Sequence, residues 1–340
     1  MTFERLSIFA LAALLAACAE PQPKEMDFSP SELRVVSGRA MGSTWSVRFV
    51  TDQKQAGKSR IRDSIAGRLE TIESQMSTWR TNSVISGFNN STNLTWFHVP
   101  PEMFAVIRTS MEISAKTGGA FDITVQPLVK LWGFGGNEPP AHMEIAKIEK
   151  VHATVGMDKL LIRANPPAIR KTRPKLQIDL SGIAKGYAVD EVARILDGYG
   201  FKQYLIEIGG ELKSRGESPK GHPWRVGIER PEPGKYQIVN AIELTDRAIA
   251  TSGDYRNFRE LGTRSYSHIM NPMTGRPRVL RNTAVSVLHD SCMVADAWAT
   301  ALAVLNFPES IRFSEASGIA CQVILKTDTE VTIHPNRHWR

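Results

Sequence analysis

Cysteine and long apolar runs are both scarce in this sequence. Three cysteines occur among 340 residues, too few for the disulfide framework that stabilises small secreted domains. The apolar run near the N-terminus covers residues 6–17, fewer than the roughly 20 that a membrane-spanning helix needs. With 42% hydrophobic residues, the chain can instead bury a large core, in one elaborate domain or in two modest ones.

Blocks of like charge are lacking as well. The net charge is +7, but the basic residues are scattered, and the densest groups lie at residues 278–281 and 337–340. Groups of that size are too small for a nucleic-acid-binding stripe, so no nucleic-acid partner is expected. We interpret the excess as a soluble basic surface, although it also favours anionic ligands or membrane surfaces.

Several sequence motifs of known chemistry are missing. The sequence contains no GxxxxGK[ST] phosphate-binding loop and no clustered Cys and His at zinc-ligand spacing, which argues against a P-loop nucleotide site and a zinc site. It also has no GxSxG elbow, but a Ser-His-Asp hydrolase built without that elbow stays open.

The N-terminus is typical of an exported lipoprotein. Small residues precede a cysteine in Leu15-Ala16-Ala17-Cys18, a pattern that resembles a bacterial lipobox. We therefore interpret residues 1–17 as a signal peptide, Cys18 as the lipidated residue and residues 18–33 as a tether, which begins polar and proline-containing. The alternative is an ordinary signal peptide with an incidental cysteine. Outside the cytoplasm Cys292 and Cys321 could pair, although the sequence does not establish that they are close.

The remainder, residues 34–335, has the pattern of an α+β domain with mixed or antiparallel sheets and several helices. Apolar residues three or four apart predict a helix over residues 61–76. Further helices are expected at residues 100–116, 183–196 and 292–305. Strands are expected twice within residues 33–49 and at residues 176–180, 203–208, 224–228, 238–244, 248–252, 284–288 and 321–325. No Pro/Gly/Ser-rich linker divides this part, so we expect one domain, with or without two lobes.

Two segments are suited to bringing the backbone close to a ligand. Gly118 and Gly119 precede Ala120-Phe121-Asp122, and glycine lets a backbone approach a ligand, although a helix end followed by a strand explains these residues more simply. In residues 179–188 a predicted strand ends and a helix begins, which exposes backbone N–H groups to an anion such as a diphosphate. Lys185 lies in the first helical turn, where a cation opposes the helix dipole unless it faces an anion; a solvated lysine is the alternative.

Two other segments carry a candidate base and candidate metal ligands. His268 lies in a short apolar stretch before a Pro-containing turn, and a histidine can take a proton from a hydroxyl near neutral pH, although a lone histidine is more often structural. Asp296 and Thr300 are four residues apart and share a helix face. Their oxygens suit Mg²⁺, but a first-turn Asp and a Thr bonded to its own helix are the simpler alternatives.

Taken in order, these segments resemble the ApbE family of FAD:protein FMN transferases. The similar segments run from about residue 39 to residue 305 and are individually short. They are Met41-Gly42-Ser43-Thr44, Glu73-Ser74-Gln75-Met76-Ser77, the Gly-Gly-Ala-Phe-Asp run, residues 179–187, Ile208-Gly209-Gly210, residues 250–255, Ser267-His268-Ile269 and residues 296–300.

The resemblance implies an α+β fold, FAD as the substrate that donates FMN, and Mg²⁺ as cofactor. It implies that His268 acts at the acceptor hydroxyl. It also implies two sets of ligands: FAD would contact Met41, Trp79, Ala120, Phe121, Asp122, Asp179, Lys185 and Met270, and Mg²⁺ would be held by the Gly182 carbonyl, Asp296 and Thr300. Two positions depart from the family's usual pattern, Asn271 before Pro272 and Glu207 before the Ile-Gly-Gly turn.

The resemblance further implies a partner and a location. The acceptor would be a Thr or Ser of a flavoprotein subunit in a membrane redox complex, such as a Na⁺-translocating NADH:quinone reductase or an Rnf-type complex. The protein would sit on the periplasmic side of a membrane, with the inner membrane favoured by the family. Two alternatives remain: an FAD pyrophosphatase that passes the phosphoryl group to water, and a non-catalytic FAD-binding lipoprotein.

Overall fold

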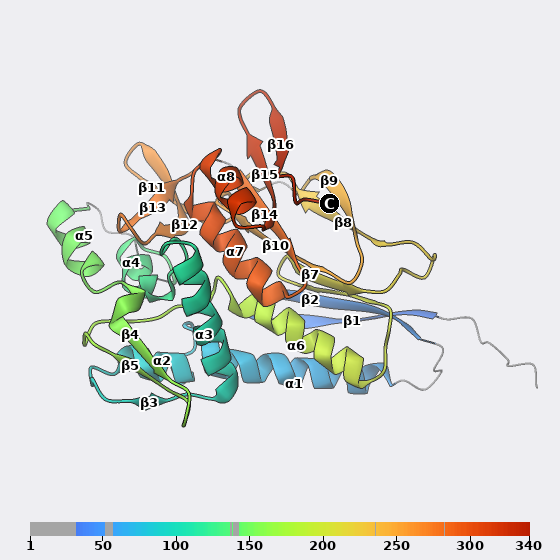
Figure 1. Ribbon diagram of the computed structural model, residues 1–340, viewed down its shortest axis with the longest axis horizontal. Helices are drawn as coiled ribbons and strands as arrows, with labels where there is room; N and C mark the ends of the chain where they lie inside the picture. The colour runs from blue at the N-terminus through green and yellow to red at the C-terminus, as the bar shows by residue number, and fades with distance from the viewer. Residues whose placement is uncertain (1–31, 52–56, 137, 139–142, 235, 282) are drawn as a thin grey trace, which may run out of the picture.

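A computed structural model describes residues 32–51, 57–136, 138, 143–234, 236–281 and 283–340 (Figure 1). The predicted signal peptide, Cys18 and most of the predicted tether lie outside these residues. The tether was predicted to end at residue 33, but Glu32 and Leu33 already belong to the first strand, where they pair with Thr51 and Val50.

An eight-stranded sheet forms the centre of the fold, in the order β1-β2-β6-β7-β10-β14-β15-β16. Every strand pair recorded among the described residues is antiparallel. The strands are β1 (Glu32–Ala40), β2 (Ser43–Thr51), β6 (Tyr204–Ile208), β7 (Glu211–Arg215), β10 (Ala248–Gly253), β14 (Thr283–His289), β15 (Ala320–Lys326) and β16 (Val331–Pro335).

Both faces of this sheet are covered, because side chains along each strand alternate between two hydrophobic clusters. On β14, Val285 and Val287 join the main core, whereas Ala284 and Leu288 belong to a second cluster on the other face. The main core is covered by α1 (Lys58–Met76), α3 (Pro101–Lys116), α6 (Ala184–Gly198) and α7 (Cys292–Val304), visible across the sheet in Figure 1. The second cluster lies under the hairpin of β8 (Trp224–Glu229) and β9 (Ile238–Leu244). The α+β prediction is confirmed.

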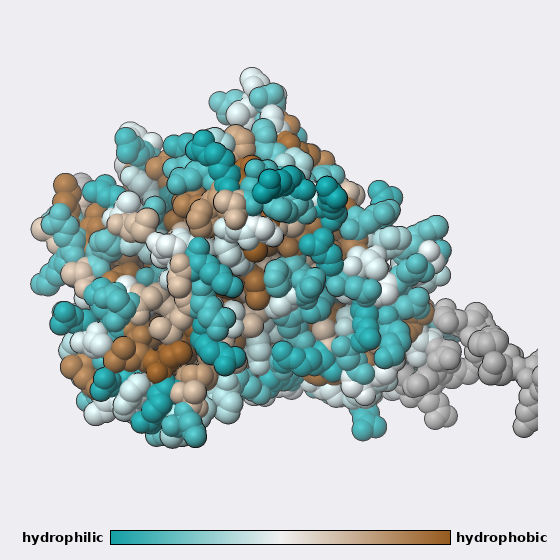
Figure 2. Space-filling view, viewed as in Figure 1, coloured by the Kyte–Doolittle hydropathy of each residue, from teal (hydrophilic) through white to brown (hydrophobic). Residues whose placement is uncertain are grey.

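Smaller elements surround this centre. Two three-stranded sheets consist of β3 (Phe97–His98), β5 (Ala168–Lys171) and β4 (Leu160–Arg163), and of β11 (Phe258–Leu261), β12 (Arg264–Asn271) and β13 (Arg276–Val279). The short helices are α2 (Val84–Asn90), α4 (Gln126–Leu131), α5 (Ile145–His152) and α8 (Glu309–Ala316), with 3-10 turns at Ile123–Val125 and Met157–Lys159. The face shown in Figure 2 is largely hydrophilic with smaller apolar areas. Within the described ranges, no helix has the length and apolar content to cross a membrane.

The predicted helices are confirmed to within a few residues, but the strand predicted over residues 176–180 is wrong. This segment pairs with a side chain instead of a neighbouring strand. The Ile178 N–H donates to Asn89 Oδ1 over 2.8 Å, and Asn89 Nδ2 donates to the Ile178 carbonyl over 2.8 Å. The buried asparagine thus satisfies the backbone groups that a ladder would otherwise use.

Two expectations about the C-terminal part also change. Cys292 and Cys321 are both buried but unpaired, so they do not form the disulfide that the sequence left open. The domain does not end at residue 335, because Asn336 is buried and its Nδ2 donates to the Ile319 carbonyl over 2.7 Å. Trp339 packs against the second hydrophobic cluster.

Lys171 is a buried cation that joins the end of α2 to the segment around Leu176. Its ammonium donates to the carbonyls of Phe88 (2.9 Å), Ser91 (2.9 Å) and Leu176 (2.8 Å), and only 1% of its surface is exposed. Burial lowers the pKa of Lys171 to about 8. The three acceptors use all the donors of the ammonium, so Lys171 holds α2 against the segment that leads to the candidate site.

Replacing Lys171 should therefore destabilise the fold. We expect Lys171→Met to lower the free energy of unfolding by about 3 kcal/mol, because two buried carbonyls and one partly buried carbonyl lose their donor. Urea unfolding at pH 7 measures the change, with the exposed Lys175 replaced as Lys175→Met for comparison. The control should stay within about 0.5 kcal/mol of wild type; an equally small effect of Lys171→Met would contradict this role.

Candidate active site

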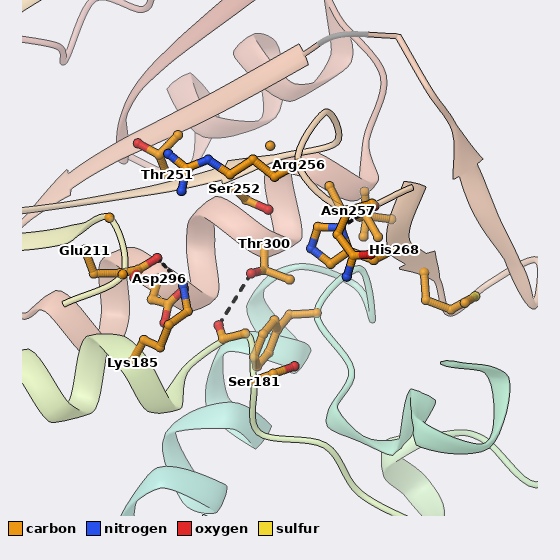
Figure 3. Close-up of a pocket in the computed structure, with 18 of the residues that line it drawn as sticks. Ser181, Lys185, Glu211, Thr251, Ser252, Arg256, Asn257, His268, Asp296 and Thr300 are labelled. Carbon is orange, nitrogen blue, oxygen red and sulfur yellow. Dashed lines mark hydrogen bonds and ion pairs between the residues drawn. The ribbon is translucent and has the colours of Figure 1, made fainter. Parts of the chain in front are cut away.

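A cavity of about 570 Å³ opens where α6 begins and where β7, β10, β12 and the middle of α7 converge (Figure 3). The residues predicted for catalysis, FAD binding and metal binding supply much of its lining. Ten of them line it: Ala120, Phe121, Asp122, Asp179, Gly182, Lys185, His268, Met270, Asp296 and Thr300. Segments separated by up to 180 positions in the chain are thus brought to one place.

Met41 and Trp79 are not in the lining of this cavity. Trp79 is 72% exposed, and the following residue, Arg80, is tied to Glu70 on α1 by an ion pair of 2.6 Å. The backbone N–H of Met41 donates to Glu73, which also lies on α1. The structure therefore holds both residues near the C-terminal end of α1, outside the lining of this cavity.

The start of α6 is pressed against α7 at Gly186. A Cβ atom at this position would lie 2.3 Å from the Cys292 carbonyl oxygen and 2.8 Å from the Asp296 Cβ, so glycine is required for the two helices to cross this closely. The Gly186 N–H donates to Asp296 Oδ2 over 3.0 Å. The Asp296 carboxylate thereby caps the first turn of α6 from the neighbouring helix.

Asp190 fixes the beginning of α7. Its carboxylate accepts hydrogen bonds from the Ser291 hydroxyl (2.7 Å) and from the backbone N–H groups of Cys292 (3.1 Å) and Met293 (3.1 Å). It also pairs with Lys213 of β7 over 2.7 Å. A carboxylate at a helix N-terminus satisfies unpaired donors and favours the dipole. One side chain of α6 thus fixes α7 and β7 in place.

Three oxygen donors for a hard cation lie around the α6–α7 crossing. Thr300 Oγ1 is 3.5 Å from the Gly182 carbonyl oxygen, and Asp296 lies one helical turn before Thr300 on α7. Burial raises the pKa of the Asp296 carboxyl, while the nearby Lys185 acts in the opposite direction. A buried carboxylate is stabilised by a cation, and an all-oxygen set suits Mg²⁺. The residues therefore fit the predicted ion, although the described part of the chain has no cluster of three or more His, Cys, Asp or Glu.

Lys185 forms an ion pair with a residue that the sequence analysis missed. Its Nζ lies 2.6 Å from Oε1 of Glu211, the first residue of β7 (Figure 3). Burial raises the pKa of Glu211 to about 7, although Lys185 lowers it. Burial disfavours the charge on Lys185, but the carboxylates of Glu211 and Asp296 raise its pKa. In the sequence Glu211 is marked only by its place directly after Gly209-Gly210, and this local feature does not indicate its pairing with Lys185.

His268 lies on β12 with its ring directed into the cavity (Figure 3). Its Nδ1 is 3.1 Å from the Asn257 carbonyl oxygen. A carbonyl only accepts, so Nδ1 carries the proton and Nε2 keeps its lone pair. Burial lowers the pKa of His268, and the charge of Lys185 acts in the same direction, against the bond to Asn257. The imidazole is consequently a neutral base at pH 7.

The carboxylates of Asp122 and Asp179 shape the loops that line the cavity. Asp122 accepts from the Thr124 N–H over 2.7 Å, and Asp179 accepts from the Ser181 N–H over 2.9 Å. Burial raises the pKa of both carboxyl groups. Each carboxylate therefore fixes the backbone of its own loop by a local hydrogen bond.

The two positions that depart from the family pattern serve turns. Glu207 Oε1 accepts from the Gly210 N–H over 2.9 Å and closes the Gly209-Gly210 turn. Asn271 Oδ1 accepts from the Met273 N–H over 2.9 Å and closes the turn after Pro272. Neither side chain needs a charge for this purpose, because both act as hydrogen-bond acceptors.

Comparison with known proteins finds similarity both in sequence and in fold. The model of the ApbE family matches residues 41–324. The FAD:protein FMN transferase of Vibrio cholerae serotype O1 is 38% identical over 94% of each chain, and that of Salmonella typhimurium is 36% identical over 96% of this chain and 93% of its own. The solved structure of flavin transferase ApbE from Vibrio cholerae superimposes with a TM-score of 0.82 at 38% identity, covering 91% of this chain and 99% of that one.

The contacts of Asp190 with the start of α7 and with Lys213 lead to a prediction about stability. We expect Asp190→Asn to lower the free energy of unfolding by about 2–3 kcal/mol, because an amide accepts fewer of the four hydrogen bonds and leaves Lys213 without its counter-charge. Chemical denaturation measures this, and hydrogen exchange should show faster exchange at the Cys292 and Met293 amides. The exposed neighbour serves as the control, as Asp290→Asn; unchanged exchange at α7 would contradict the anchor.

Proposed function

This chain belongs to the ApbE family, and we propose that it is a Mg²⁺-dependent FAD:protein FMN transferase. In this reaction a protein hydroxyl attacks the FMN-side phosphorus of FAD, a new P–O bond forms, and the bond to AMP breaks. The observation that carries the proposal is the convergence of a neutral base, a cation and three oxygen donors on one cavity. These are His268, Lys185, and the Gly182, Asp296 and Thr300 set.

His268 has the properties required of the base. A Thr or Ser hydroxyl is a weak nucleophile at neutral pH, and a positioned base contributes roughly 10²–10⁴-fold to the rate. Nδ1 is held by the Asn257 carbonyl, so Nε2 takes the hydroxyl proton as the oxygen bonds to phosphorus. AMP leaves with the electrons of the broken P–O bond.

Lys185 and the oxygen donors act on the diphosphate. Charge gathers on the phosphoryl oxygens and on the leaving group, and a bound Mg²⁺ would neutralise part of it. Gly182, Asp296 and Thr300 would hold that ion, and the Lys185 ammonium adds a fixed positive charge beside the start of α6. Because the loops of Asp122 and Asp179 are held internally, the cavity can orient FAD without first reorganising.

We further propose an acceptor for the FMN group and a location for the enzyme. The acceptor is a flavoprotein subunit of a membrane redox complex, of the Na⁺-translocating NADH:quinone reductase or Rnf type. The enzyme is tethered by a lipid on Cys18 to the periplasmic side of the bacterial inner membrane. The Leu15-Ala16-Ala17-Cys18 segment supports the anchor, and the family supports the acceptor.

Flavin transfer is tested with the detergent-solubilised full chain, FAD, Mg²⁺ and a purified acceptor subunit. Intact mass should show one added FMN, and a chelator should abolish the gain. We expect Asp296→Asn and His268→Gln to reduce the rate at least about 100-fold. The exposed His98→Gln should remain at the wild-type rate. Accumulation of FMN and AMP without an adduct would identify a pyrophosphatase instead, and FAD binding without turnover would identify a carrier.

The pH dependence of transfer follows from the environment of His268. Burial lowers the pKa of this histidine below its usual 6.5, so the neutral base persists to lower pH than in an exposed histidine. The acid side of the pH profile should therefore have its midpoint below pH 6.5. Single-turnover transfer measured across pH 5–8 checks this, and a half-maximal rate at or above pH 7 would contradict it.

A further inference from the structure

Glu211 is a buried carboxylate in the cavity wall to which neither the family pattern nor the proposed reaction assigns a role. It begins β7 directly after the Gly209-Gly210 turn, and 1% of its surface is exposed. Its Oε1 pairs with Lys185, whereas its Oε2 is buried with no hydrogen-bond partner among the described residues. A buried carboxylate oxygen left unpaired is costly, so this placement calls for a functional explanation.

The position of Lys185 explains why a carboxylate is needed there. Lys185 lies in the first turn of α6, where the helix dipole disfavours a cation, and burial disfavours its charge further. An ammonium has three donors, and in the described part of the chain only Glu211 is recorded as accepting from it. The remaining donors are free for an anionic ligand, while the contact with Glu211 limits the rotation of the long side chain.

We propose that Glu211 is a positioning residue, which holds the Lys185 ammonium directed at the diphosphate of FAD. The inference rests on the proposed function, because it takes the anion to be that diphosphate. Glu211 touches no reacting atom in this role and acts through Lys185 alone. A purely structural ion pair would share the geometry but would leave FAD affinity unchanged once the fold was intact.

A double-mutant cycle separates these roles. Glu211→Gln, Lys185→Met and the double variant are made in the full chain, with Glu217→Gln as a control that removes an exposed carboxylate near β7. FAD binding in Mg²⁺ is measured by flavin fluorescence, and the circular dichroism spectrum and Tm establish that each variant is folded. We expect Glu211→Gln to raise the Kd for FAD roughly tenfold and Lys185→Met to raise it at least as much.

The double variant gives the decisive comparison. If Glu211 acts through Lys185, adding Glu211→Gln to Lys185→Met should not raise the Kd further. The double variant should also have a higher Tm than Lys185→Met. In Lys185→Met the buried Glu211 carboxylate has lost its counter-charge, and the double variant replaces that carboxylate by a neutral amide. Additive effects on Kd, or an unchanged Kd in folded Glu211→Gln, would overturn the proposal. If wild-type protein bound no FAD, the proposed function would fail together with it, a result distinct from either of those.

Discussion

The candidate site depends on the crossing of α6 and α7. Asp190 on α6 fixes the first turn of α7 through two backbone N–H groups and the Ser291 hydroxyl, while Asp296 on α7 caps the first turn of α6 at Gly186. Each helix thus satisfies donors at the N-terminus of the other. Because Lys185 and Thr300 lie on these same two helices, the relative position of the cation and the oxygen donors is determined by helix packing.

Two carboxyl groups and one ammonium lie close together beside this crossing. Asp296 and Glu211 are both buried, both have raised pKa values, and both face Lys185. Two carboxylates beside one ammonium leave an excess of negative charge, and a bound divalent ion would offset it. On the other wall, His268 stays neutral because it is buried and near the same ammonium. One lysine therefore influences the acid–base state of three neighbours.

Sequence patterns predicted the helices and the gathering of ten site residues, for identifiable reasons. The helix over residues 61–76 has a clear apolar stripe, and the ordered short motifs identify a family whose fold brings them together. The strand expected at residues 176–180 was wrong because its partner is the side chain of Asn89, 89 positions from Ile178. Glu211 was missed because its role depends on Lys185, 26 positions earlier, and no local pattern records such a pairing.

The hydrogen bond between Asp296 and Gly186 engages one oxygen of the only anionic ligand in the proposed metal site. With one lone pair of Oδ2 used by the amide, Oδ1 would keep both of its lone pairs for the ion, and the protein would supply one anionic group and two neutral oxygens. Magnesium prefers six oxygens and commonly completes its shell with water and substrate phosphates. The ion and FAD would then bind with mutual cooperativity, each raising the affinity of the other by the same factor. An enzyme of this design would respond to the supply of both.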